Sequence, residues 1–336
     1  MREAGNDPAA GPGYRLALFG ATTLIGKALR ECLERGAFPV RSLRLFAGPG
    51  GEGSLTEFRD EPILVTRPDP DLAGGIDLAF LCGGPEESAP FLPWAEAKGF
   101  LAIDLSTASS RDPEVPIVHH RLNPSRLRRR PGVIGSPGPV AHALCTLLAP
   151  LRDAFGVAGA VVVAFPPAAD RGEEGIEELH RQTVSLLNFQ AAPRGVFPRQ
   201  VAFNLVPAGA GQEAAIAAET RRVLEAEFPL EILTLQAPVF HGHSLLVRVE
   251  TCSPATPAEI ADRLRGEPDL RVPEAGGEGI TPVEVCGREG IHVLPFPAGP
   301  APATGRWLWL VADDLRAGAA WNAVRLAERL LGGTEA

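Results

Sequence analysis

A turn near the N-terminus, framed by two glycines, has the residues needed to hold a phosphate group. Gly20 and Gly26 enclose the stretch ATTLI, which follows a short apolar run and precedes a segment of helical periodicity. A strand-to-helix turn offers free backbone N–H groups and the positive end of the helix dipole to a pyrophosphate. Gly20 suits the tight turn, and Gly26 suits close helix–strand packing. This pattern predicts cofactor contacts from Gly20, Thr22, Thr23, Leu24, Ile25 and Gly26.

Two departures from the dinucleotide pattern predict weak binding. The middle position of the turn, where the backbone must approach the phosphate, is Thr23 instead of glycine, and its Cβ crowds the phosphate. About 20 residues further on, the pattern places an acid for the ribose, but the second strand ends in Phe46-Ala47-Gly48. The loop 48–53 has no arginine for a 2′-phosphate. NAD and NADP both stay open as cofactors, with weakened affinity.

The cysteines and paired histidines could also do chemistry. Five cysteines lie scattered in apolar context without a CxxC motif, which predicts buried thiols in a reducing compartment and no disulfides. His241 and His243 have a spacing that can ligate a metal, but no third ligand stands nearby. We therefore expect no metal site.

The elements around the turn predict a doubly wound α/β domain over 14–135, Rossmann-like in type. Short apolar runs predict parallel strands, and helical periodicity between them predicts crossover helices. Residues 1–13 are expected to form a disordered tail. The predicted strands are 14–19, 43–47, 61–66, 76–81, 100–105 and 133–134, with helices over 22–34 and 90–99.

The second half alternates less regularly, which predicts an α+β domain over 136–312 with a mostly antiparallel sheet. An amphipathic helix over 314–331 closes the chain. The other predicted helices are 141–155, 175–187, 212–228 and 257–266, and the predicted strands are 157–165, 231–239 and 243–252.

Composition excludes several classes of partner. The chain has 336 residues and a net charge of −9, which argues against nucleic acid and anionic membranes. Its longest apolar run, 156–165, is too short to span a bilayer, and the N-terminus has no apolar leader segment. The expected location is the cytoplasm. The basic residues within 126–130 are expected to form a solvated surface.

Eight stretches, in order along nearly the whole chain, resemble the aspartate-semialdehyde dehydrogenase family, and most closely its Usg-type homologues. The resemblance implies an NADP-binding Rossmann domain, a domain for catalysis and dimerisation, and a final helix, 313–332, that returns to the first domain. The stretches are FGATTLIG (19–26), IDLSTASSRDPEVPIV (103–118), APLRDAFGV (149–157), GEEGIEELHRQT (172–183), FNLVP (203–207), ETRRVL (219–224), APVFHGHSLLVRVE (237–250) and DDLRAGAAWNAVRLAE (313–328).

The family reaction needs a thiol that this chain lacks at the matching position. In the family, a cysteine at a helix N-terminus attacks an aldehyde, a histidine moves the proton, hydride passes to NADP, and phosphate cleaves the thioester. The matching stretch is Ser136-Pro137-Gly138-Pro139, so the nucleophile position is Gly138 or Pro139, depending on a one-residue register. Cys145 lies about 10 Å further along the helix, at 1.5 Å per residue, and is expected to be a buried packing thiol.

The resemblance assigns the remaining roles residue by residue. His243 falls on the catalytic histidine, but Gln236 stands where the family has an arginine that binds the substrate carboxylate, and Pro166 replaces a glutamine that positions the acyl intermediate. Arg111 lies next to the position of the phosphate-binding arginine, which aligns with Ser110. Glu213 lies near a substrate contact, and Asn322 falls on the cofactor side.

These replacements predict a family member that has lost the family's dehydrogenase activity. General acid–base effects contribute only about 10²–10⁴-fold, which cannot replace a covalent route. Two alternatives remain open: an NAD(P)-dependent oxidoreductase that acts on another aldehyde through His243, and an interaction subunit of a true dehydrogenase. We expect a homodimer whose small-molecule ligand the sequence does not identify.

Overall fold

The computed structural model describes residues 13–208, 211–274, 277, 279–297, 305–313, 315 and 318–332. The predicted tail, apart from Gly13, lies outside these residues. The chain divides into two compact units: 13–116, 126–136 and 323–332 form unit 1, and 117–125 and 137–322 form unit 2. No helix within the described ranges has both the length and the apolar character needed to cross a membrane.

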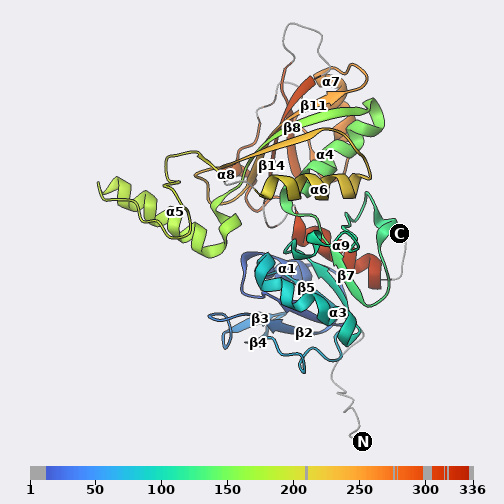
Figure 1. The fold of residues 1–336 in the computed structure, drawn as a ribbon, viewed down its shortest axis with the longest axis vertical. Helices are drawn as coiled ribbons and strands as arrows, with labels where there is room; N and C mark the ends of the chain where they lie inside the picture. The colour runs from blue at the N-terminus through green and yellow to red at the C-terminus, as the bar shows by residue number, and fades with distance from the viewer. Residues whose placement is uncertain are drawn as a thin grey trace, which may run out of the picture. The chain divides into compact units, whose positions relative to one another are not determined.

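Unit 1 is a twisted sheet with the strand order β3-β4-β2-β1-β5-β6-β7, in which every neighbouring pair is parallel except the hairpin β3–β4 (Figure 1). The chain runs outward from β1 to one side and then to the other, which is the doubly wound order. The strands are β1 (Tyr14–Phe19), β2 (Val40–Phe46), β3 (Leu55–Phe58), β4 (Glu61–Thr66), β5 (Leu78–Leu81), β6 (Leu101–Asp104) and β7 (Gly132–Gly135), and the helices are α1 (Leu24–Arg35), α2 (Pro85–Ser88) and α3 (Leu92–Lys98).

The apolar runs of the sequence form the centre of this sheet. Residues 16–19 of β1 and all of β5 are buried, as expected for strands covered on both faces. The prediction of a doubly wound Rossmann-like domain is confirmed. The short strand β3 was not predicted, because its exposed sequence LTEF has no apolar run and pairs only as a hairpin with β4.

Unit 2 contains a second sheet with the order β12-β13-β14-β11-β8-β10-β9. Among the described residues, four of its six neighbouring pairs are antiparallel, which confirms the predicted α+β domain with a mixed, mostly antiparallel sheet. The strands are β8 (Val157–Phe165), β9 (Val206–Pro207), β10 (Leu230–Gln236), β11 (His243–Thr251), β12 (Leu270–Arg271), β13 (Ile291–Pro295) and β14 (Gly305–Ala312).

Helices pack on one face of this sheet. α4 (Pro139–Phe155) lies against β8 and β11 and also contacts α6 (Gln212–Leu224) and α7 (Pro257–Arg265) (Figure 1). Side chains that point to this face, such as Leu147, Val247 and Leu310, are fully buried in one core. Side chains on the other face alternate with them and are partly exposed: Val161, Val163, Leu246, Trp307, Trp309 and Leu233, of which Leu233 is 61% and Trp307 40% exposed.

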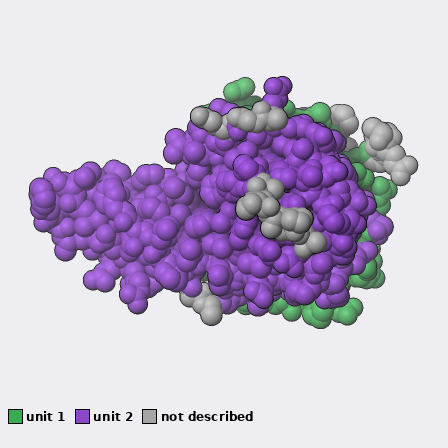
Figure 2. All heavy atoms as spheres, turned by 90° about the horizontal axis from the view of Figure 1, so that it is seen from above, with its two compact units in different colours: residues 1–116, 126–136, 323–336 green, residues 117–125, 137–322 purple. Residues whose placement is uncertain are grey.

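An arm projects from unit 2 (Figures 1 and 2). It consists of α5 (Gly172–Leu187) and the loop that follows, 188–205. The buried carboxylate of Glu178 accepts the backbone N–H groups of Gly195, Val196 and Phe197, and Gln182 Oε1 accepts those of Val201 and Ala202. These two side chains of the GEEGIEELHRQT stretch hold the loop onto the helix.

The short helix α8 (Pro282–Val285) contacts β14.

Candidate active site

The turn between β1 and α1 requires its glycines. Gly20 has a φ of 79°, and a Cβ there would stand 2.4 Å from the backbone nitrogen of Gly83. A Cβ on Gly26 would stand 2.3 Å from the carbonyl oxygen of Gly20. The local geometry expected of a nucleotide-binding turn is therefore present.

The side chain of Thr23 accepts a hydrogen bond from a backbone N–H at the N-terminus of α1. Its Oγ1 accepts the N–H of Gly26 at 3.1 Å and lies 2.9 Å from the carbonyl oxygen of Gly20 and 2.8 Å from that of Cys82. Its own N–H donates to Gly20 O at 3.1 Å. Thr23 is thus the N-cap of α1, and two N–H groups that would face a phosphate already have partners within the chain.

A carboxylate also lies at the edge of the sheet where a dinucleotide would bind. Glu87 Oε1 stands 3.3 Å from the place of a Cβ on Gly48, directly after β2, and its Oε2 stands 2.7 Å from that of Gly83, after β5. The loop 48–53 approaches Thr22 so closely that a Cβ on Gly51 would stand 2.6 Å from Thr22 Oγ1. The turn suits a pyrophosphate, but Thr23 and Glu87 do not, so the residues present fit a dinucleotide poorly.

The N-terminus of α4, where the resemblance places the nucleophile, is filled by a carboxylate. Gly138 is the N-cap, and Pro139 is the first residue of the helix. Gly138 N–H donates to Glu219 Oε2 of α6 at 2.9 Å, and Glu219 is only 3% exposed. Neither register places a thiol at this helix end.

Cys145 cannot replace that thiol. It is fully buried, its Sγ lies 3.7 Å from the carbonyl oxygen of Thr220, and burial together with the charge of Glu219 raises the pKa of the thiol. The prediction of a packing thiol is confirmed. All five cysteines are free, but the expectation that they are buried is wrong for Cys252 and Cys286, which are exposed because they lie in loops just after elements end.

His243 pairs with an acid that the sequence reading did not assign. It is the first residue of β11 and 2% exposed, and its Nε2 lies 2.9 Å from Asp170 Oδ1. Asp170 belongs to the short 3₁₀ turn Ala168–Arg171 that follows β8. A carboxylate in this position orients an imidazole.

Gln236 and Pro166, both substituted relative to the resemblance, contact each other. Gln236 Nε2 donates to the carbonyl oxygen of Pro166 at 2.9 Å and to that of Ala237 at 3.2 Å. The amide of Gln236 is 8% exposed. Its donors are thus used to join the ends of β8 and β10, and it has no charge with which to bind a carboxylate.

Glu213 and Arg111 each contact a residue of their own unit. Glu213, in the first turn of α6, accepts the N–H of Gly211 at 3.1 Å. Burial raises the pKa of Glu213, but hydrogen bonds from backbone N–H groups and from Thr234 lower it by more, so the pKa is below its usual value. Arg111 is exposed in unit 1 and pairs with Glu86 at 2.8 Å.

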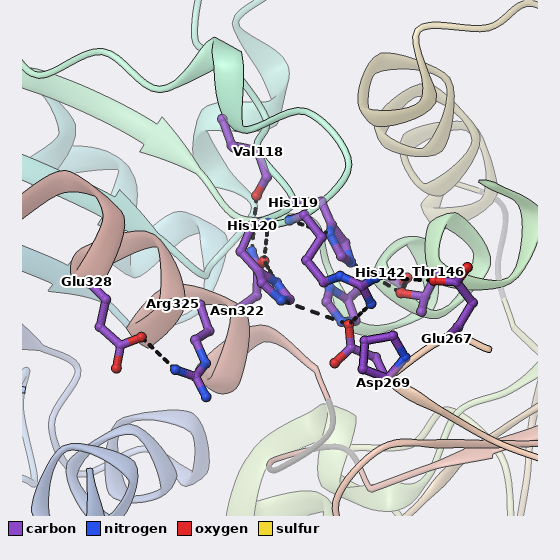
Figure 3. Close-up of polar contacts among 12 residues, drawn as sticks. Val118, His119, His120, His142, Thr146, Glu267, Asp269, Asn322, Arg325 and Glu328 are labelled. Atoms are coloured by element: carbon purple, nitrogen blue, oxygen red, sulfur yellow. Dashed lines mark hydrogen bonds and ion pairs between the residues drawn. The ribbon is translucent and has the colours of Figure 1, made fainter. Parts of the chain in front are cut away.

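Asn322 is fully buried and holds the loop before α4 (Figure 3). Its Nδ2 donates to Val118 O at 3.0 Å, and its Oδ1 accepts the backbone N–H of His120 at 2.8 Å and lies 3.0 Å from His120 Nδ1. These contacts occupy both ends of the amide. They also favour the proton on Nδ1 of His120.

Three histidines that the sequence analysis did not consider form a buried stack beside Asn322 (Figure 3). The ring centroids of His119 and His120 are 4.9 Å apart, and those of His119 and His142 are 4.5 Å apart. Burial, with the charge of neighbouring His120, lowers the pKa of His142 to about 4, although Asp269 opposes the shift. Burial, with the charges of His142, His120 and Arg121, also lowers the pKa of His119. The rings of His119 and His142 are therefore neutral near pH 7.

The predicted site residues form separate local groups within each unit. In unit 2 the structure joins Gly138 to Glu219, His243 to Asp170, and Gln236 to Pro166. The adjacent residues His119 and His120 are visible as a pair in the sequence. No short-range sequence pattern predicts the contacts that Glu87 and Glu219 make in the folded chain. Among the described residues, no group of three or more His, Cys, Asp or Glu side chains is arranged to hold a metal ion.

Comparisons with known proteins match both units. Residues 15–130 match the family described as semialdehyde dehydrogenase, NAD binding domain, and residues 148–317 match semialdehyde dehydrogenase, dimerisation domain. The chain is 30% identical to an aspartate-semialdehyde dehydrogenase of Aquifex aeolicus, over 95% of this chain and 98% of the relative. It is 34% identical to a USG-1 protein homolog of Pseudomonas aeruginosa, over 94% of this chain and 97% of that protein.

A solved structure confirms the likeness of the fold. A probable aspartate-semialdehyde dehydrogenase from Pseudomonas aeruginosa superimposes with a TM-score of 0.89 at 32% identity, covering 96% of this chain and 99% of the other. The similarity thus extends over both units and does not stop at the nucleotide-binding turn.

Proposed function

Because the chain belongs to the aspartate-semialdehyde dehydrogenase family, with USG-1 homologues among its relatives, we propose that it is a member that no longer catalyses the family reaction. The observation that carries the proposal is the N-terminus of α4. There, Gly138 and Pro139 replace the nucleophile, and the Glu219 carboxylate accepts the N–H of Gly138. A carboxylate at that place also repels any thiolate.

The substrate side of the same site supports this proposal. Gln236 is neutral, and its amide donates to Pro166 and Ala237, so no guanidinium binds an acidic substrate there. His243, the retained base, is paired with Asp170. Without a nucleophile to deprotonate, this His–Asp pair has a positioning role in the turn after β8.

We also propose that dinucleotides bind weakly. An anionic pyrophosphate would have to displace the Thr23 cap from Gly26 and would approach the Glu87 carboxylate. The family match to an NAD binding domain supports binding as such, and the replaced middle glycine supports a low affinity.

A homodimer is the assembly we propose. The sheet of unit 2 leaves a face of partly exposed apolar side chains, including Leu233 and Trp307, within the residues that match a dimerisation domain. Exposed aromatic side chains of this kind are typical of protein interfaces. The arm adds Phe189, fully exposed at a φ of 56°, and Phe203, 67% exposed at a φ of 58°.

An assay of the purified protein tests the proposal. With aspartate semialdehyde, NADP and phosphate, we expect no phosphate-dependent reduction of NADP. An aspartate-semialdehyde dehydrogenase assayed in parallel controls for the substrate, and a His243→Ala variant controls for contamination. Turnover at the rate of the parallel enzyme that disappears in the His243→Ala variant would refute the proposal.

A further inference from the structure

Unit 2 contains a cavity of about 450 Å³ that includes none of the candidate active-site residues and shares Trp309 with the partly exposed face of the sheet. Its walls come from α7, β12, β13, β14 and the segment 279–280. Leu270, Val272, Leu294 and Trp309 give it apolar walls, while Arg265, Arg271 and His292 add polar groups. Cavities of about 300–1,000 Å³ with this mixture are typical of small-molecule sites.

The cavity is positively charged, although the whole chain is acidic. None of the described residues that line it carries a carboxylate. Arg271 donates to the carbonyl oxygen of Leu270 at 3.0 Å and has no carboxylate partner among the described residues. The nearby acids are engaged elsewhere: Glu267 and Asp269 pair with Arg121 at 3.2 and 2.9 Å. Within the described residues, Arg271 therefore has no carboxylate that compensates its charge.

Arg265 adds a second, partly compensated charge. It pairs with Asp262 and donates to the carbonyl oxygen of Pro273 at 3.1 Å. Arg265 nevertheless lines the cavity, so its charge is compensated only by an exposed partner.

His292 also lines the cavity, as a neutral ring. Its Nε2 is buried and has no hydrogen-bond partner among the described residues. Burial, with the charges of Arg288 and Arg271, lowers the pKa of His292. An unpaired buried nitrogen costs about 1–3 kcal/mol, and an acceptor bound next to Arg271 would allow the ring to gain a partner.

The shape of the cavity is fixed by the segment that closes it. Trp309 Nε1 donates to the carbonyl oxygen of Ile280 at 3.1 Å, which ties that segment to β14. Gly279 lies so close to β13 that a Cβ there would stand 2.7 Å from Leu294 Cδ2. A cavity held in this way does not need to be ordered when a ligand binds.

We propose that this cavity binds a small organic acid. Its carboxylate pairs with Arg271 and, on the outer side, with Arg265, since a planar guanidinium matches a carboxylate. Its hydrocarbon part packs on Leu270, Leu294 and the indole of Trp309. An inorganic anion would leave these apolar walls uncovered, so the ligand class is a carboxylate with an apolar body.

Titration of the full-length protein with isocaproate, followed by nuclear magnetic resonance, tests the proposal. We expect shifts of the Trp309 indole N–H and a higher pKa of the His292 ring when the acid is bound. The neutral isocaproamide and inorganic phosphate should each bind at least about tenfold more weakly. Equal binding of the amide would overturn the role of charge, and tighter binding of phosphate would overturn the role of the apolar walls.

A pair of variants locates the site. Arg271→Gln should weaken isocaproate binding by about tenfold to a hundredfold, because it removes a charge-assisted hydrogen bond. Arg288→Gln removes an equal charge near His292 from a residue that does not line the cavity, so we expect less than about a threefold change. The proposal is wrong if both variants weaken binding equally, or if no probe shifts the resonances of Trp309 and His292.

Discussion

The backbone N–H of Gly138, the N-cap of α4, donates to the buried carboxylate of Glu219, so a carboxylate of the chain itself already lies at this helix end. The site therefore differs from an active one by more than the absence of a thiol. The helix end that would lower the pKa of a thiol is used, and the charge that uses it has the same sign as a thiolate.

Restoring the thiol alone should therefore fail. In Gly138→Cys and in Pro139→Cys, which cover both registers, we expect a thiol pKa no lower than the usual value of about 8.5. Adding Glu219→Gln should lower the thiol pKa by about one to two units, since it removes the opposing charge. The ultraviolet absorbance of the thiolate against pH measures both values. A low pKa in either single variant would contradict this account.

Stability should fall in mild acid because of His142. Its pKa is about 4 in the folded chain and 6.5 as the reference value, so the unfolded chain binds the proton first. Stability is then complete above pH 6.5 and declines as the pH falls from 6.5 to 4, by about 3 kcal/mol for this group. Urea unfolding at a series of pH values measures the decline.

Two variants separate this effect from general acid unfolding. His142→Leu should reduce the decline between these pH values, since it removes one of the two buried groups that take up a proton on unfolding, and His119 remains. His180→Gln changes an exposed histidine of the arm and should leave the profile unaltered. An identical pH profile for wild type and His142→Leu would show that the buried stack is not responsible.

Glu87 should set a preference between the two dinucleotides. Its carboxylate lies beside Gly48, where the ribose end of the cofactor is expected, and would repel a 2′-phosphate more than a 2′-hydroxyl. Because Glu87 is exposed, we expect NAD to bind only about three- to tenfold more tightly than NADP. Calorimetry gives both affinities.

The control for this preference is the neighbouring residue. Glu87→Gln should narrow the difference between NAD and NADP, whereas Glu86→Gln, whose side chain pairs with Arg111, should keep it. A preference of the wild type for NADP would show that Glu87 does not determine which dinucleotide binds more tightly.

The arm should unfold separately when Glu178 is removed. Glu178→Ala leaves the N–H groups of Gly195, Val196 and Phe197 without their acceptor, which costs about 1–3 kcal/mol at the buried N–H of Phe197 and less at the other two, which water can reach. We expect faster hydrogen exchange over 193–202 and unchanged protection of α4. Glu177→Ala removes an exposed carboxylate one residue earlier and serves as the control. Faster exchange in α4 as well would mean that the arm and the core unfold together.

Local sequence signals predicted the elements that carry their own pattern. β1, β4 and β8 were predicted with the bounds they have, since each is an apolar run ended by Gly, Pro or a charged turn. The predicted helix 212–228 ends earlier, at Leu224, because Glu225 takes a left-handed conformation with φ of 51°. The final helix begins at Ala319 instead of 314, and residue 314 lies outside the described residues.

Features that depend on distant contacts could not be read from the sequence. β13 and β14 were not predicted, since β14 becomes a strand by pairing with β11, some distance earlier in the chain. The acid at Gly48 comes from Glu87, which is remote from the position where a dinucleotide pattern places it. The same holds for Asp170 at His243, since the turn after β8 and the start of β11 meet only in the folded sheet.

The contact between Gln236 and Pro166 makes it difficult to restore the family residues at these two positions one at a time. On the alignment we propose, both residues are substitutions, and the amide of one now binds the carbonyl of the other. Arginine restored at 236 alone would place a guanidinium where Gln236 is only 8% exposed, and burying that charge costs free energy. Each ancestral residue therefore needs the other, and a descendant of this chain would have to regain both before either was useful.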